Sequence, residues 1–369
     1  MSIQIKPVSG QHLKTFVKLP WTLYQDDPCW VPPLISDQLN YLNPKKGPFY
    51  EFGDAELFLA CKDDVPVGRI SAQIDRQYES HQDAETGFFG FFESINDIEV
   101  AEQLLHTAET WVRDHGKSRI CGPFNFTLYD ASGLLVKGFD TLPVLLTNYN
   151  KSYYAGLLEQ CGYRKHIDWY AFRVSSDLHI RPVFYRIRER IRRQGIVIKS
   201  IDMKKLDEAV DYIGPIFNEA WAGNHGHVPL TDRQLEEFKA ELKYAIEPDL
   251  TYLAFLDGQC IGFSLSVKDA NPAIQKANGR LFPFGLFKIM HGMRHVKRLR
   301  TFAMGVLKEH RNRGLDIVFY LDTIENGIKM GYTESECSVI VETNNRMIGA
   351  LEDLNAEQYK TFRFYENSL

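Results

Sequence analysis

The sequence contains no long apolar segment and no recognisable export signal. Its 369 residues include no apolar run near the roughly 18 residues that a membrane span requires. The chain begins MSIQIKPVSG, which lacks the apolar core and the small-residue cleavage pattern of a secretory signal. We therefore expect a soluble, cytoplasmic protein without a membrane partner.

Positive charge is also in short supply. Lysine and arginine number 43 against 48 acidic residues, which gives a net charge of −5. Nucleic acid and anionic lipid favour a broad basic surface, so we expect no nucleic-acid partner, and any such contact must be local. One basic run contains six arginines between Arg181 and Arg193. It is either an anion or RNA contact or a solvated linking helix, and the acidic total favours the helix.

Clusters of metal-binding residues are absent as well. The six cysteines are far apart, without a CxxC pair or a compact group of the zinc type, so we expect reduced and mostly buried thiols. His225 and His227 supply two imidazoles in one loop, but no third ligand is evident. No metal site is therefore predicted.

The two halves of the chain repeat one order of elements: hairpin, strand, helix, strand, helix, strand. In the second half, β-rich runs flank the turn signal Asp257-Gly258, and apolar residues recur at helical spacing from Ile317 to Ile328. The first half adds a loop rich in glycine, proline and aromatic residues, and long loops of this kind are often functional. We predict a first domain at 1–175 with an inserted loop at 122–147, a basic linking helix at 176–195 and a second domain at 196–369.

The segment VLKEHRNRGLD, residues 306–316, joins a predicted strand to a predicted helix. The first N–H groups of a helix have no partner within it and carry partial positive charge, so they form a natural phosphate site. Gly314 allows the backbone to approach a ligand closely, and Arg311 and Arg313 add positive charge. The segment is either a pyrophosphate-binding loop or an ordinary strand-to-helix turn.

This loop resembles the signature of the GNAT family of acyl-CoA-dependent N-acyltransferases, in which a strand valine precedes Arg/Gln-x-x-Gly-x-Gly/Ala. The family has a second sequence block, an asparagine followed by a short helix and a Gly-Phe-like ending. The segment NNRMIGALEDLNA, from Asn344, resembles this block, and YYAGLLEQCGY in the first half matches it better. The resemblance covers about 196–369 and extends in weaker form over 1–175. The WVPP segment at 30–33 is similar to that of a functionally obscure group of two-domain GNAT-like bacterial proteins. The resemblance implies an α/β protein of two tandem GNAT-like folds, each a mixed, mostly antiparallel sheet flanked by helices.

The resemblance also implies acyl transfer from acetyl-CoA or another acyl-CoA to an amine. The strand end would contact pantetheine and polarise the thioester carbonyl, while the loop would hold phosphate. The residues assigned to acyl-CoA in this way are Gly305, Val306, Leu307, Arg311, Asn312, Arg313, Gly314, Leu315, Asp316 and Asn345. Two positions depart from the family pattern: Asp316 replaces the second loop glycine, and Leu351 replaces a tyrosine that protonates the departing thiolate.

The acceptor is expected to be a small-molecule or peptide amine, and homodimer formation stays open. GNAT-like folds receive their acceptor after the first helix, where Trp221, His225 and His227 lie in this chain. These residues either bind the acceptor, with a histidine as base, or form a solvated loop. Glu336 is another candidate base. Because side chains alternate along a strand, Glu336 shares a face with Glu334, and the alternative is that this face is simply exposed to solvent.

The insertion and the first half give a few further candidates. Asn125, Tyr129 and Asp130 are polar residues among aromatics and are predicted to contact substrate. The first half lacks a phosphate loop, since Glu93 and Asp97 would repel phosphate and Asp97 is better explained as a helix N-cap. We therefore place acyl-CoA in the second domain. A non-catalytic acyl-CoA-binding protein and an aminoacyl-tRNA-dependent transferase of paired GNAT-like fold remain as alternatives.

Overall fold

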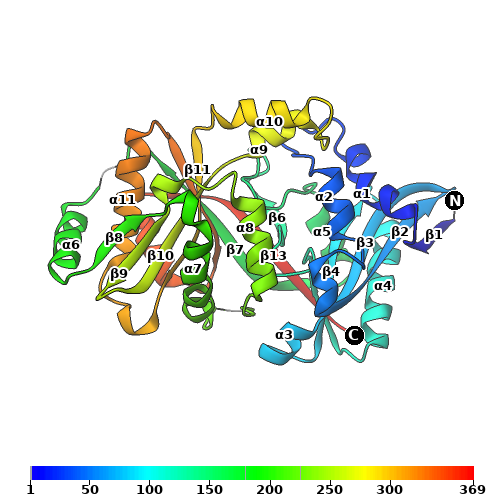
Figure 1. The fold of residues 1–369 in the computed structure, drawn as a ribbon. Coiled ribbons are helices and arrows are strands. Elements are labelled where there is room, and N and C mark those ends of the chain that lie inside the picture. Colours follow the sequence, from blue (N-terminus) through cyan, green and yellow to red (C-terminus); the bar gives the residue numbers. More distant parts are fainter. Residues whose placement is uncertain (1, 179, 225) are drawn as a thin grey trace. The chain divides into compact units, whose positions relative to one another are not determined.

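The computed structural model describes residues 2–178, 180–224 and 226–369, which form two compact units (Figure 1). Unit 1 contains the chain up to Trp169 together with Asn271–Gly292 and Lys360–Leu369. Unit 2 contains Tyr170–Ala270 and Met293–Tyr359. The sequence predicted two continuous domains, whereas here strands β7 (Arg164–Ser175) and β13 (Glu357–Ser368) each contribute residues to both units.

The sheet of unit 1 follows the order β1-β2-β3-β4-β5-β13, with β6 also paired to β13. Strands β4 and β5 are parallel, whereas β1–β2, β2–β3, β3–β4 and β5–β13 are antiparallel. The β2–β3 hairpin turns at Asp63 and Asp64, both with positive φ. The strands are β1 (Ile3–Pro7), β2 (Gly53–Lys62), β3 (Val65–Asp75), β4 (Thr86–Ser94), β5 (Arg119–Gly122) and β6 (Leu134–Lys137).

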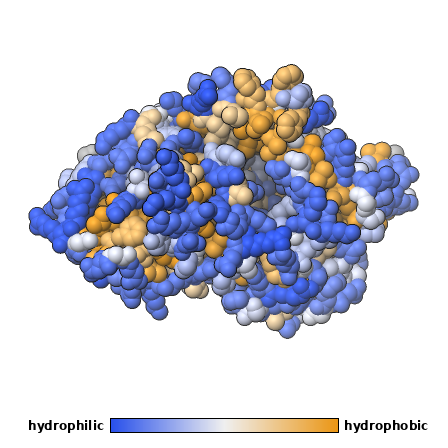
Figure 2. Space-filling model, in the orientation of Figure 1, coloured by the Kyte–Doolittle hydropathy of each residue, from blue (hydrophilic) through white to orange (hydrophobic). Residues whose placement is uncertain are grey.

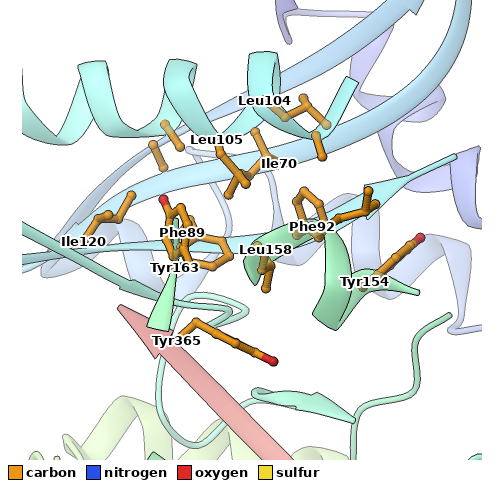
Figure 3. Close-up of a cluster of buried hydrophobic side chains, with 14 of the residues drawn as sticks. Ile70, Phe89, Phe92, Leu104, Leu105, Ile120, Tyr154, Leu158, Tyr163 and Tyr365 are labelled. Atoms are coloured by element: carbon orange, nitrogen blue, oxygen red, sulfur yellow. The ribbon is translucent and has the colours of Figure 1, made fainter. Parts of the chain in front are cut away.

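Helix α4 (Ile98–Asp114) provides one side of the main core of unit 1. Its apolar face recurs at helical spacing, and Leu104 and Leu105 pack against the buried Ile70 and Phe89 of the sheet (Figure 3). Asp97 accepts a hydrogen bond from the Glu99 amide at 3.0 Å, so the predicted N-cap is confirmed. The other helices of this unit are α1 (His12–Leu23), α2 (Ile35–Tyr41), η1 (Pro48–Glu51), α3 (Arg76–His81), α5 (Tyr154–Gln160), α9 (Asn271–Ala277) and α10 (Gly285–Met293).

Unit 2 repeats this arrangement with strands in the order β12-β11-β10-β9-β8. Strands β11 and β12 are parallel, and the remaining pairs in this series are antiparallel. The β9–β10 hairpin turns at Asp257 and Gly258, as the sequence predicts. The strands are β8 (Val197–Ser200), β9 (Tyr252–Leu256), β10 (Gln259–Lys268), β11 (Arg298–Val306) and β12 (Glu334–Val341).

Helix α11 (Leu315–Lys329) buries its apolar face in unit 2 and also packs against the basic helix α6 (Pro182–Arg193). Arg188 of α6 forms ion pairs with Asp322 at 3.1 Å and Glu325 at 2.6 Å, and Ile191 is buried. The sequence predicted a helix linking two domains, whereas these contacts make α6 part of unit 2. The other helices are η2 (Met203–Lys205), α7 (Leu206–Trp221), α8 (Asp232–Leu242), η3 (Pro248–Leu250), η4 (Lys308–His310) and α12 (Asn345–Glu352).

No helix within the described parts of the chain combines the length and the apolar character needed to cross a bilayer.

Candidate functional site

Strands β11 and β12 are paired for only part of their length. Their parallel register runs from Arg298↔Glu334 to Thr301↔Cys337. Strand β11 continues to Val306, still paired with Gly262 of β10, and β12 continues to Val341. The two strands therefore diverge after Thr301. Gly305 still pairs with Phe263 of β10, whereas Val306 lies beyond the pairing with β12. Main-chain groups beyond a strand pairing need partners from side chains, water or a ligand.

The chain leaves this divergence through a short turn and enters α11 at Leu315, close to the predicted helix start. Asn312 and Gly314 have φ of 64° and 91°, so the backbone reverses twice through the left-handed region. Gly314 is the N-cap of α11 and provides no side-chain cap. The first amides of the helix thus carry their partial positive charge without a capping side chain.

The glycine at position 314 has a structural reason as well. Its positive φ disfavours other residues, and a Cβ built there would lie 2.6 Å from Cγ2 of Ile187 in α6. Arg190 of the same helix donates to the carbonyl oxygen of Arg313 at 2.7 Å. Helix α6 therefore supports one side of the loop, a contact that the sequence did not reveal.

The end of α7 supports the loop through three consecutive residues. The Glu219 carboxylate accepts from the Lys308 amide at 2.9 Å, and the Trp221 indole donates to the Met304 carbonyl of β11 at 3.0 Å. Arg311 donates to the carbonyl oxygens of Ala220 at 2.6 Å and of Val306 at 3.2 Å. These contacts position the loop, and they direct the Arg311 guanidinium to main-chain carbonyls.

Arg346 in the first turn of α12 is a loop contact that the sequence analysis missed. Its guanidinium donates to Asn312 at 3.0 Å and to the carboxylate of Asp316 at 2.9 Å. The negative charge of Asp316 is thus balanced by an arginine that is itself half exposed. The N-cap of α12 is Asn344, which accepts from the Met347 amide at 3.2 Å, and the predicted Asn345 follows it as an exposed residue. The arginine directly after Asn345 was the only sequence signal for this contact.

Glu336 lies at the last paired positions before the strands diverge, opposite Arg300. Glu336 is 1% exposed, so the alternative that it lies on a solvent-exposed face of the strand is wrong. Its carboxylate accepts hydrogen bonds from Ser338 and Tyr359. Burial raises the pKa of Glu336, while the Ser338 hydrogen bond and the Arg300 charge act in the opposite direction. Burial lowers the pKa of Arg300 to about 10. A carboxyl group with a raised pKa at the point of divergence has the chemistry of a general base.

The other acceptor candidates of unit 2 lie beside this region. His227 is 3% exposed and lies 5.9 Å from the Phe217 ring, which stacks on Trp221 at 4.6 Å, so His227 is not a solvated imidazole. His225 lies outside the described residues. Within the residues that the structure describes, no group of three or more His, Cys, Asp or Glu side chains could hold a metal ion. Leu351, at the position of the family tyrosine, is fully buried in an apolar cluster.

The candidates in the insertion belong to unit 1. There, too, β4 and β5 are paired only as far as Phe88↔Cys121 before they diverge. Asn125 accepts from the Phe91 amide of β4 at 2.8 Å, so the insertion itself satisfies main-chain groups beyond the pairing. Asp130 accepts from the Thr127 amide at 2.8 Å, and Tyr129 donates its amide to the Thr127 hydroxyl at 3.3 Å. Their contacts stabilise the insertion, and a role in substrate binding stays a prediction.

Comparison with known proteins places this geometry in context. No protein-family model matches the chain. Protein YghO of Escherichia coli (strain K12) is 34% identical over 365 residues, covering 97% of this chain and 93% of YghO. Bacterial ceramide synthase of Caulobacter vibrioides (strain NA1000 / CB15N) is 33% identical over 364 residues, covering 97% of this chain and 95% of the synthase. A solved tandem GNAT protein from the clavulanic acid biosynthesis pathway superposes with a TM-score of 0.58 at 13% identity, covering 100% of this chain and 98% of that chain. At this identity the likeness concerns the fold alone, and it confirms the predicted tandem GNAT fold.

Proposed function

Because this chain belongs to the family of tandem GNAT-fold proteins that includes YghO and the bacterial ceramide synthase, we propose that it is an acyl-CoA-dependent N-acyltransferase. The observation that carries the proposal is the divergence of β11 from β12 directly before an α11 start without a side-chain cap. In unit 1 the corresponding divergence is filled by the insertion. The donor site is therefore assigned to unit 2.

The residues of this region fit an acyl-CoA in chemical terms. The first amides of α11, after Gly314, suit a diphosphate, and Arg313 supplies positive charge directly before them. Val306 lies beyond the pairing with β12, and its main-chain amide is assigned to the amide-rich arm or to the thioester oxygen. Asp316 does not oppose this assignment strongly, since Arg346 balances its charge. Arg311 contributes by fixing the loop to α7.

The chemistry assigned to the chain is removal of a proton from the attacking amine and stabilisation of the oxyanion. Bound acyl-CoA supplies an acyl group activated as a thioester. The Glu336 carboxylate accepts the amine proton through the Ser338 hydroxyl that it holds. A free thiol has an unperturbed pKa near 8.5, so the thiolate leaves with modest help, and loss of the family tyrosine at Leu351 slows the reaction without preventing it.

The acceptor is proposed to be a long-chain amino alcohol. The support is the name of the Caulobacter relative, because a ceramide is the N-acylated form of such an amine. Trp221 and His227 are the proposed acceptor-side residues, since Phe217 links them and Trp221 contacts β11. With this acceptor we expect long-chain acyl-CoA to be preferred to acetyl-CoA. We also expect the reaction to take place in the cytoplasm.

The test is acyl transfer with purified protein. We expect incubation with a long-chain acyl-CoA and a long-chain 2-amino alcohol to release free coenzyme A and to form the amide in equal amounts, measured by thiol titration and mass spectrometry. Acetyl-CoA and a peptide amine serve as comparison substrates. A protein that binds coenzyme A but yields no amide with any of these pairs would support a non-catalytic acyl-CoA-binding protein instead.

A further inference from the structure

An apolar surface is exposed on the α9–α10 hairpin of unit 1. It consists of five side chains, which we call the α10 patch: Phe282, Phe284, Leu286, Phe287 and Met290. Phe282 and Phe287 are 78% and 72% exposed, respectively. Figure 2 shows the orange apolar surface where Figure 1 draws α10. Contiguous apolar exposure of this kind marks an interaction surface, because water disfavours it.

The hairpin under the patch is held firmly by the rest of unit 1. The Trp21 indole donates to Asn278 at 2.9 Å, the Ile35 amide donates to the Gly279 carbonyl at 3.0 Å, and Gln275 donates to the Pro28 carbonyl at 2.8 Å. The exposed phenylalanines are therefore presented by an ordered element. The equivalent connection of the first repeat, between β3 and β4, contains only the short α3, so the fold itself does not require the hairpin.

Charge distinguishes between the surfaces that this patch could meet. Residues 270–308 contain no aspartate or glutamate, although the whole chain has a net charge of −5. Lys276, Arg280 and Lys288 are exposed on the hairpin itself. A symmetric contact between two copies would bring these cations together, whereas an anionic lipid surface complements them. Exposed aromatic and aliphatic side chains combined with lysine and arginine are typical of helices that lie at a bilayer surface.

We infer that the α10 patch binds the surface of a bilayer that contains anionic lipid. The phenylalanines, Leu286 and Met290 enter the boundary between headgroups and acyl chains, and the hairpin cations contact the headgroups. This inference does not depend on the acyltransferase activity. It replaces the expectation from net charge that the protein has no membrane partner, and the contact is local, as that charge requires.

Vesicle sedimentation with the full chain tests this surface. We expect the protein to bind vesicles of phosphatidylglycerol and phosphatidylcholine more tightly than vesicles of phosphatidylcholine alone, and high salt to weaken the binding. Replacing Phe282, Phe284 and Phe287 together by serine should weaken binding by roughly tenfold or more. The matched control is Val65→Ser with Tyr244→Ser, which removes exposed apolar side chains elsewhere and should bind like the wild type. Lys276→Glu with Lys288→Glu should abolish the preference for anionic vesicles.

Three outcomes would overturn the inference. One is wild-type protein that sediments with neither vesicle type, and another is a triple serine variant that binds like the wild type. The third is a wild-type dimer that the triple serine variant converts to monomer while vesicle binding is unchanged, because the patch would then join two copies of the chain. Circular dichroism of each variant shows whether it is folded, and exposed positions of this kind are expected to tolerate serine.

Discussion

Replacing Glu336 by glutamine is expected to lower kcat about 10²- to 10⁴-fold, the range typical for loss of a general base. The dependence of the rate on pH gives a more specific test of Glu336 as the base. In the wild type, the rate rises with pH as Glu336 loses its proton, and burial raises the pKa of Glu336, so the rise lies at a higher pH than for an ordinary glutamate. In Glu336→Gln this limb of the profile should disappear. Steady-state rates measured across pH for both proteins check the result.

Ser338→Ala is the matched control, because it removes one hydrogen bond to Glu336 and leaves the carboxylate in place. It should retain the pH-dependent limb while lowering the rate less. A purely structural Glu336 would behave differently, since its loss removes one of the two carboxylates, with Asp269, whose charge acts on the buried Arg300, and so destabilises unit 2. If Glu336→Gln loses stability and rate together yet keeps the wild-type pH profile, the assignment of Glu336 as base is wrong.

Replacing Glu93 by alanine is expected to lower the free energy of unfolding by about 3–5 kcal/mol. Glu93 is buried in unit 1, where its carboxylate accepts from the Tyr24 hydroxyl at 2.8 Å and the Tyr154 hydroxyl at 2.7 Å, and pairs with Arg69 at 3.4 Å. Arg69 is only 8% exposed, so loss of the carboxylate leaves a buried cation and two buried hydroxyl donors without this acceptor. Urea unfolding followed by circular dichroism measures the change.

Two further variants separate charge from hydrogen bonding at this cluster. Tyr24→Phe removes one donor and keeps the ion pair, so it should cost about 0.5–1.5 kcal/mol. The pair Glu93→Leu with Arg69→Met should be much more stable than Glu93→Ala, because no charge remains buried. A loss below about 1 kcal/mol in Glu93→Ala would show that Arg69 finds water or another partner, against the buried-charge account.

The sequence predicted the parts of this protein that depend on local pattern. The helical and two-residue spacing of apolar residues predicted the repeated order of elements. The glycine and basic residues before Leu315 predicted the start of α11. Asp97 was recognised as an N-cap because capping depends on a few neighbouring residues.

The remaining features depend on residues that are distant in the chain. The contribution of β7 and β13 to both units is a matter of long-range pairing, which has no local period. The same holds for the loop contacts, because a basic motif does not reveal that Arg311 contacts Ala220 or that Arg346 balances Asp316. The burial of Glu336 was missed because alternation gives the face of a strand and not what covers that face.

We propose that the first amides of α11 hold the diphosphate of an acyl-CoA. Hydrogen exchange of backbone amides, measured by mass spectrometry with and without coenzyme A, tests this assignment. We predict slower exchange at residues 312–317 when coenzyme A is bound, and unchanged exchange at the start of α4, where Asp97 already caps the helix. Unchanged exchange at 312–317 in protein saturated with coenzyme A, or protection at the start of α4 instead, would contradict the account.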